Sequence, residues 1–108
     1  MPPPNLGELE QLVLLAIMRL GDDAYGVAIR REIAMRTRRE PSFGSVYTAL
    51  TRLETKGLVA SHLGDSTPER GGRRKKHYAI SAAGRRALRR SLTAIRIMAH
   101  GVDAWGTP

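Results

Sequence analysis

The chain has 108 residues, 42% of them hydrophobic, and its 18 Lys and Arg residues against 10 Asp and Glu residues give a formal net charge of +8. This length supports one domain with a modest core, which small domains often complete by dimerising. The absence of cysteine excludes disulfides, a zinc finger and a thiol catalyst. The longest apolar run, residues 12–18, is too short to span a membrane, and the N-terminus lacks the pattern of a signal peptide, so we expect a cytoplasmic protein.

The positive charge is concentrated in the last third of the chain. Before Arg70 there are 8 basic and 9 acidic residues, a net charge of −1, whereas from Arg70 onward there are 10 basic residues and only Asp103, a net charge of +9. Such asymmetry indicates a surface that binds a polyanion. A basic face that serves only solubility is the alternative that charge alone leaves open.

Two helices are predicted in the first third of the chain. Residues 9–20 are apolar nearly all round, which is typical of a helix buried on more than one side. Residues 21–23, Gly-Asp-Asp, end this helix, and an Asp can cap the next one. The second helix is predicted from about residue 24 to residue 36, with Ile29 and Ile33 on its inner face.

A third helix is predicted from about residue 43 to residue 56, with Ser42 as its N-cap. Its buried stripe should be Val46, Leu50 and Leu53, at spacings of four and three. The opposite face carries short hydroxyl side chains, which would let the helix backbone approach another large object closely. An ordinary polar solvent face is an equal alternative for this helix in isolation.

A two-stranded hairpin is predicted after the third helix. Gly57 ends the helix, and residues 58–63 and 76–80 should form the strands, joined by a polar loop over residues 64–72. Glycine and arginine dominate the end of this loop, where glycine permits positive φ and close approach.

Ser81 is predicted to cap a last helix, from about residue 82 to residue 103. Its apolar residues recur at spacings of four and three, which is typical of a coiled-coil seam. We therefore predict a dimer interface at Leu88, Leu92, Ile95, Ala99 and Val102. The cluster Arg85–Arg90 either flanks this seam in solvent or contacts DNA.

Catalysis finds little support. His62, His77 and His100 are scattered and lack metal-ligand spacing, although His62 and His77 could face each other across the hairpin. Ser42 has no accompanying His and Asp set, so it is a cap and not a nucleophile. We expect no enzyme activity, no metal site and no cofactor.

The third helix, the hairpin and the charge together predict a winged helix-turn-helix that binds double-stranded DNA. Arg52 is the side chain on the third helix able to make a bidentate pair with guanine, and the hairpin, or wing, would contact phosphate or the minor groove. Contacts from the third helix are predicted at Ser42, Gly44, Ser45, Tyr47, Thr48, Thr51 and Arg52, with Ser45, Thr48 and Arg52 as readers and Tyr47 on phosphate or sugar. Wing contacts are predicted at Arg70, Gly71, Gly72, Arg73, Arg74, Lys75 and Lys76.

Several motifs recur together over about residues 6–90. They are Leu9-Glu10-x-Leu12-Val13-Leu14, Ala24-Tyr25-Gly26, Gly44-Ser45-Val46-Tyr47-x-x-Leu50-x-x-Leu53-Glu54-x-x-Gly57-Leu58, Gly72-Arg73-Arg74-Lys75-Lys76-x-Tyr78 and Ser81-x-x-Gly84. With these motifs the chain resembles the PadR family of bacterial transcriptional regulators. Thr48 stands where many relatives have proline, which leaves the detail of base contact open.

The resemblance implies a homodimer that acts mostly as a repressor, with the last helix forming much of the dimer interface. It also implies a mainly α fold with a small β-hairpin, in which residues 1–81 form the winged helix-turn-helix and residues 82–108 the dimerisation helix and tail. Some relatives release DNA when a small aromatic or drug-like molecule binds at the dimer interface. Met98 and Trp105 are the candidates to line such a pocket, with Met18 as a further one, unless Met98 only packs in the interface and Trp105 docks near a fraying end.

Two other functions stay open. An RNA-binding module could use the same basic surface, with a preference for structured or single-stranded RNA. A protein-interaction domain could pair its last helix with an unrelated partner instead of a second copy of itself.

Overall fold

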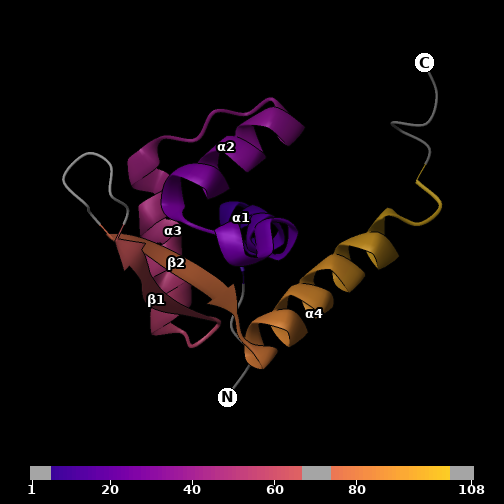
Figure 1. Ribbon diagram of the computed structural model, residues 1–108. Helices are drawn as coiled ribbons and strands as arrows, with labels where there is room; N and C mark the ends of the chain where they lie inside the picture. The colour runs from indigo at the N-terminus through magenta and orange to yellow at the C-terminus, as the bar shows by residue number, and fades with distance from the viewer. Residues whose placement is uncertain (1–5, 67–73, 103–108) are drawn as a thin grey trace.

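The structure is a computed structural model that describes residues 6–66 and 74–102. Its elements, in chain order, are α1 (Glu8–Leu20), a short 3-10 helix η1 (Gly21–Asp23), α2 (Gly26–Thr37), α3 (Phe43–Thr55), β1 (Val59–Ser66), β2 (Arg74–Ile80) and α4 (Ala82–Ala99). The predicted class, mainly helical with a small antiparallel hairpin, is confirmed (Figure 1).

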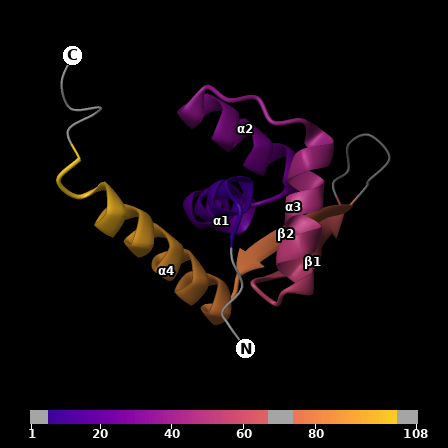
Figure 2. The ribbon, with the colours of Figure 1, turned by 180° about the vertical axis from the view of Figure 1, so that it is seen from behind.

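Helix α1 lies at the centre of the fold, with α2, α3 and the hairpin around it (Figure 1, Figure 2). Its nearly uniform apolar character fits this position, because several partners cover it. The stripes predicted for α2 and α3 are also buried, as the helical spacing indicated. The buried residues of these helices include Val13, Leu14, Ala16, Ile17, Ile29, Ile33, Val46, Leu50 and Leu53.

The junction between α1 and α2 differs from the prediction. No Asp caps α2: η1 takes up Gly21–Asp23, and the N-cap is Tyr25, whose side chain makes no capping hydrogen bond. Ala24 and Tyr25 lie along β2 instead, because Tyr78 N donates to Ala24 O at 2.8 Å and Tyr25 forms a bridge with His77. The helix therefore starts later than predicted, and this segment attaches the hairpin to the helical body.

The two strands reach further toward the wing tip than predicted. β1 continues to Ser66 and β2 begins at Arg74, because a register shift near the tip lets the polar segment continue the ladder. His62 lies opposite His77, and their rings stack with centres 5.6 Å apart, which confirms that they face each other. A Cβ at Gly64 would be 2.9 Å from the His77 ring, so this glycine makes room for a cross-strand side chain.

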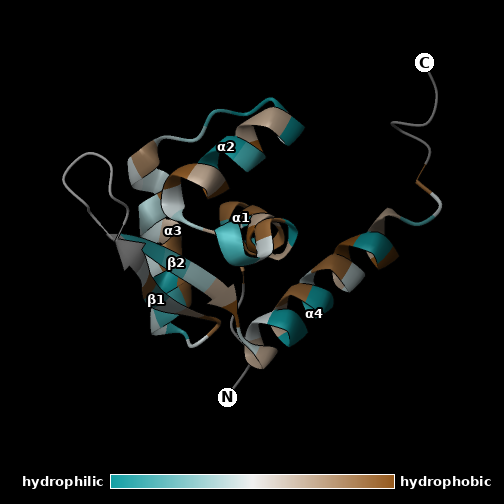
Figure 3. Cartoon of the chain, viewed as in Figure 1, coloured by the Kyte–Doolittle hydropathy of each residue, from teal (hydrophilic) through white to brown (hydrophobic). Residues whose placement is uncertain are grey.

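Ser81 caps α4 as predicted, with its Oγ accepting from Gly84 N at 3.0 Å. A Cβ on Gly84 would be 2.1 Å from Leu58 O, so the close approach of α4 to the start of the hairpin requires glycine. The helix ends at Ala99, earlier than predicted, because the chain then leaves the helical conformation and Gly101 adopts a φ of 79°. The second half of α4 extends away from the body, with brown apolar patches along it (Figure 3).

Candidate nucleic-acid interface

The outward side of α3 carries the polar row that the sequence predicted for DNA contact. Ser42 begins this surface as the N-cap, with its Oγ accepting from Ser45 N at 3.1 Å. Because the apolar stripe faces inward, the remaining side chains face solvent. The exposed residues on α3 and its cap include all those predicted, namely Ser42, Gly44, Ser45, Tyr47, Thr48, Thr51 and Arg52.

One flank of α3 borders a hollow of about 680 Å³, here called the α1-side hollow. Its lining residues are Ser42, Gly44, Ser45, Thr48, Ala49 and Arg52 from α3 and its cap, with Gly7, Glu8, Leu9 and Glu10 from the start of α1. The Glu10 carboxylate is buried, and it accepts from Gly7 N at 2.8 Å and from Lys56 Nζ at 2.9 Å. Its charge is therefore compensated within the protein, whereas the Glu8 side chain stays exposed.

The other flank of α3 borders a hollow of about 520 Å³, here called the wing-side hollow. Its lining residues are Tyr25, Gly26, Val27, Arg31, Tyr47, Lys75 and Lys76. Lys75 Nζ lies 4.2 Å from the centre of the Tyr25 ring, which is a cation–π contact. The Tyr47 side chain covers Gly26, where a Cβ would be 3.0 Å from the tyrosine hydroxyl. Cationic and aromatic groups thus converge beside α3.

The predicted wing residues divide into two groups. Arg70, Gly71, Gly72 and Arg73 lie outside the described residues, as does the side chain of Arg74. Lys75 and Lys76 are exposed on β2 and both line the wing-side hollow. The two lysines in the described part of the wing therefore lie on the same surface as Tyr47.

Polar contacts join the wing to the end of α3. The Ser61 hydroxyl donates to Glu54 at 2.5 Å and, with Lys76 at 3.5 Å, holds the pKa of Glu54 below its ordinary value. On the opposite side of the hairpin, His77 Nδ1 lies 2.9 Å from Asp22 O. Burial raises the pKa of Tyr78 on the same strand. The polar contacts therefore hold the hairpin against the end of α3 on one side and against η1 on the other.

Beyond its first turns, α4 leaves apolar side chains uncovered. Leu88, predicted for the dimer seam, is buried in the chain's own core, and Ala99 is half-buried. Val102 lies past the end of the helix. The exposed apolar residues of this segment include Leu92, Ile95, Ile97, Met98 and Val102.

A groove of about 310 Å³ separates α1 from α4. It is lined by Leu15 and Met18 of α1 and by Arg85, Leu88, Arg89, Leu92, Thr93 and Arg96 of α4. Met98, predicted to line an effector pocket, is absent from this lining because it does not share the helix face of Leu92 and Arg96. Trp105 lies outside the described residues. Met18, the further candidate for such a pocket, does line the groove.

The model of the transcriptional regulator PadR-like family matches residues 14–90. The chain belongs to this family. It is therefore a DNA-binding transcriptional regulator, in agreement with the winged helix-turn-helix described above.

Solved structures of PadR-like regulators share this fold. A PadR family regulator from Clostridium difficile is 25% identical, with a TM-score of 0.72 over 85% of this chain and 91% of that one. One from Eggerthella lenta is 28% identical, with a TM-score of 0.68 over 87% and 81%. A PadR-like regulator from Bacillus cereus, 22% identical, has a TM-score of 0.73 over 93% and 92% and supports the fold alone. No curated protein matches the chain.

Tyr25, Gly26 and Arg31 of this PadR-like chain were not predicted as contact residues, although they line the wing-side hollow. Tyr25 and Gly26 belong to a motif quoted for the family resemblance, but no role followed from the motif itself. Arg31 carried only the signal of an exposed charge on α2. All three line the wing-side hollow with Tyr47, a grouping that depends on how α2 packs beside α3.

Residues 6–66 and 74–102 contain neither a cluster of metal ligands nor a helix that could span a membrane. Within these ranges, no three His, Asp or Glu side chains come together as metal ligands. None of the helices described combines the length and the apolar character needed to cross a membrane. The rings of His62 and His77 stack against each other within the wing.

Proposed function

We propose that this PadR-like regulator is a cytoplasmic repressor that binds a pseudo-palindromic DNA operator as a homodimer. The observation that carries the proposal is the exposed row of short polar side chains on α3, flanked by a cationic hollow. The mechanism is steric, because a dimer seated on a promoter excludes the transcription machinery.

The side chains of α3 support its insertion into the major groove. Ser45 and Thr48 are short enough to bring the helix backbone near the base edges. Arg52, on the same flank, can donate two hydrogen bonds to guanine O6 and N7, a pairing that contributes about 1–3 kcal/mol of discrimination. These residues would read the sequence.

The wing-side hollow supports contact with the DNA backbone. Arg31, Lys75 and Lys76 place three positive charges around one concave surface, beside the Tyr25 and Tyr47 rings. We propose that the wing arginines, Arg70, Arg73 and Arg74, extend this basic surface, with Gly71 and Gly72 allowing close approach. Such contacts position a protein on the duplex without reading its sequence.

The outer half of α4 supports a homodimer. Ile95 is 55% exposed and Met98 78% exposed, which is unfavourable for apolar side chains gathered on one helix. In a homodimer, the α4 helices of the two copies would cover each other's exposed apolar side chains, because an interface with twofold symmetry is self-complementary. In this proposal residues 82–108 dimerise and residues 1–81 bind DNA, with the two recognition helices about 34 Å apart or a multiple of that distance.

The groove between α1 and α4 supports release by a small aromatic or drug-like effector. Leu15, Met18 and Leu92 supply apolar walls, and arginines border the groove. Its volume of about 310 Å³ lies near the lower end of the usual range for ligand sites, about 300–1,000 Å³. A molecule bound there would change the angle of α4, and with it the separation of the recognition helices in a dimer.

Selection of bound duplexes from a random DNA pool, with RNA as competitor at near-physiological salt, tests the proposal. Enrichment of an inverted repeat is expected. Binding without enrichment, lost steeply as salt rises, would mean that the basic surface only grips a polyanion. Capture by the RNA competitor would favour an RNA-binding module.

Light scattering of the full chain, alone and with the selected duplex, tests the assembly. The expected mass is that of a dimer, both free and on DNA. A monomer without affinity for any duplex would support a protein-interaction domain whose last helix pairs with another protein.

A further inference from the structure

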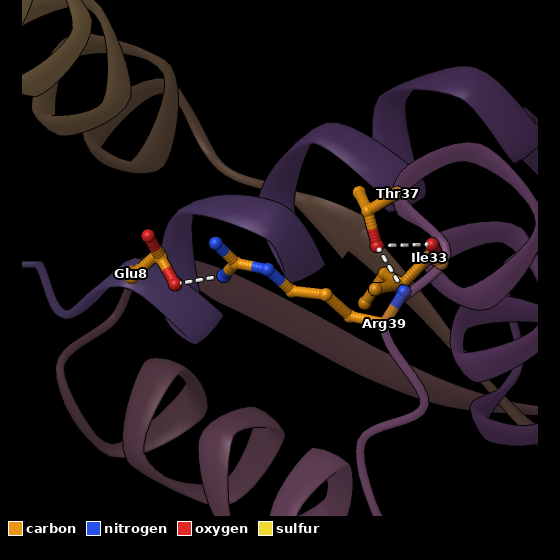
Figure 4. A network of polar contacts seen from close by, with 4 residues as sticks. All are labelled: Glu8, Ile33, Thr37 and Arg39. Atoms are coloured by element: carbon orange, nitrogen blue, oxygen red, sulfur yellow. Dashed lines mark hydrogen bonds and ion pairs between the residues drawn. The ribbon is translucent and has the colours of Figure 1, made fainter.

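An ion pair connects the first turn of α1 to the turn before the recognition helix. Arg39 Nη1 contacts Glu8 Oε1 across 31 positions of sequence (Figure 4). The Arg39 side chain is 60% exposed and that of Glu8 is 70% exposed. Both charges therefore remain accessible to a ligand outside the protein.

The backbone beneath Arg39 is held in place while its side chain extends outward. Thr37 Oγ1 donates to Ile33 O at 2.7 Å and accepts from Arg39 N at 3.1 Å (Figure 4). Nearby, Arg30 Nε donates to Pro41 O at 2.7 Å, which fastens the other end of the turn. Arg39 can thus change partners through side-chain rotation, without rearrangement of the turn.

Glu8 lies at the border of the surface proposed to face DNA. It lines the α1-side hollow together with Ser45, Thr48 and Arg52. The neighbouring Glu10 differs, because its carboxylate is buried and bonded to Lys56. Glu8 is therefore the accessible carboxylate of this hollow among the residues described.

We propose that Arg39 is a DNA-phosphate contact and that Glu8 is its intramolecular competitor. On binding, the Arg39 guanidinium exchanges the Glu8 carboxylate for a backbone phosphate. This inference rests on the proposed function, since it requires a duplex seated on α3. Glu8 then lowers affinity for every duplex alike and leaves the preference for the operator unchanged, because phosphate contacts carry no sequence information.

The exchange of Glu8 for phosphate is favourable because only the pair between Arg39 and phosphate releases counterions from the DNA. An exposed ion pair between side chains contributes little, since solvent screens it and ordering two long side chains costs entropy. An arginine that neutralises a phosphate also releases a condensed counterion, which favours binding and makes it depend on salt. The ion pair between Glu8 and Arg39 is thus weak enough to break on DNA binding. Breaking it still reduces the free energy gained from the contact between Arg39 and phosphate.

The test uses four single variants of the full chain, measured on the selected operator and on a random duplex over a range of salt. Glu8→Gln should increase the affinity for both duplexes by about two- to five-fold, which corresponds to the energy of an exposed ion pair. Arg39→Gln should weaken both and flatten the slope of log K against log salt by about 0.9, the value for one phosphate contact.

A second ion pair, matched in charge, supplies the controls for a change in net charge. Arg36 and Glu32 on α2 form a pair of the same charges along the α1–α2 groove and line neither hollow beside α3. Glu32→Gln and Arg36→Gln change the net charge by the same amounts, and they should have smaller effects on both duplexes. Equal gains for Glu8→Gln and Glu32→Gln would show a bulk charge effect and overturn the proposal.

The double variant Glu8→Gln with Arg39→Gln decides whether the two residues act on one another. The gain from Glu8→Gln should disappear once Arg39 is gone; a gain that persists would show that Glu8 repels phosphate directly and would refute the exchange. Thermal unfolding of each variant checks that the fold is retained. If the unmodified chain binds no duplex, the proposed function and this inference fail together, whereas operator binding without the predicted coupling overturns only the inference.

Discussion

The two hollows beside α3 share that helix as a wall and differ in the charged groups that line them. The α1-side hollow combines hydroxyl groups and Arg52 with the carboxylates of Glu8 and Glu10, whereas the wing-side hollow combines Arg31, Lys75 and Lys76 with two tyrosines. Under the proposed function, the contacts with phosphate therefore belong mainly to the wing side. In the same proposal, hydrogen bonds to bases come from the other flank, where Arg52 lies beside carboxylates, and this separation would favour sequence discrimination over nonspecific binding.

The largest expected effect comes from the core that supports both hollows. Leu50 is fully buried on α3, so Leu50→Ala should lower the free energy of unfolding by about 2–5 kcal/mol through lost burial and a residual cavity. Urea unfolding measures this change. Leu63→Ala is the matched control, because Leu63 is 55% exposed on β1, and it should cost less than about 0.5 kcal/mol.

Removal of Arg52 should affect the α1-side hollow alone. Arg52→Ala should weaken binding to the selected operator by about 1–3 kcal/mol and binding to random DNA much less, because a bidentate pair with guanine would be lost. Titration of both duplexes measures the difference. Equal losses on both would remove Arg52 as a reader, and Arg36→Ala, on α2, controls for the loss of one positive charge.

Removal of Lys75 should affect the wing-side hollow alone. Lys75→Ala should weaken operator and random duplexes alike and flatten the salt slope by about 0.9, the expected contribution of one phosphate contact. Arg90→Ala, an exposed cation on α4, should leave the slope unchanged if the Arg85–Arg90 cluster is a solvated flank. A loss confined to the operator would instead make Lys75 a sequence reader.

The sequence predicted the elements that build these hollows better than the hollows themselves. The Ser42 cap, the stripe Val46, Leu50 and Leu53, and the Ser81 cap are local signals, since helical spacing and N-capping involve residues only a few positions apart. Each of these predictions is confirmed. Local pattern thus determined which side of α3 faces outward.

The features that the sequence did not predict depend on contacts between distant residues. The backbone of Ala24 pairs with that of Tyr78, so α2 starts later than predicted. Gly26 packs against the Tyr47 side chain, and both residues line the wing-side hollow. The periodicity of helices and strands does not predict contacts between residues so far apart in the sequence. The end of α4 is a different case, because continued apolar spacing predicted a helix beyond Ala99, whereas the helix ends there and Gly101 adopts a positive φ.

The smallest expected effect concerns the link that holds the wing beside α3. Ser61 and Lys76 lower the pKa of Glu54 from its ordinary value of 4.5, so the charged carboxylate is favoured in the folded state. Its contribution to stability is therefore present above pH 4.5 and is lost as the pH falls through the lower folded pKa. Glu54→Gln should remove this part of the acid sensitivity.

Urea unfolding from pH 7 down to pH 3, on the chain and on Glu54→Gln, measures the difference. The two stability curves should lie apart at neutral pH and approach each other below about pH 4, near the ordinary carboxyl pKa. Because the carboxylate is exposed, solvent screens the effect, and the separation should be small. Parallel curves across the whole range would show that Glu54 does not stabilise the wing through its charge, and the wing-side hollow would then depend on the His77 contact and on strand pairing.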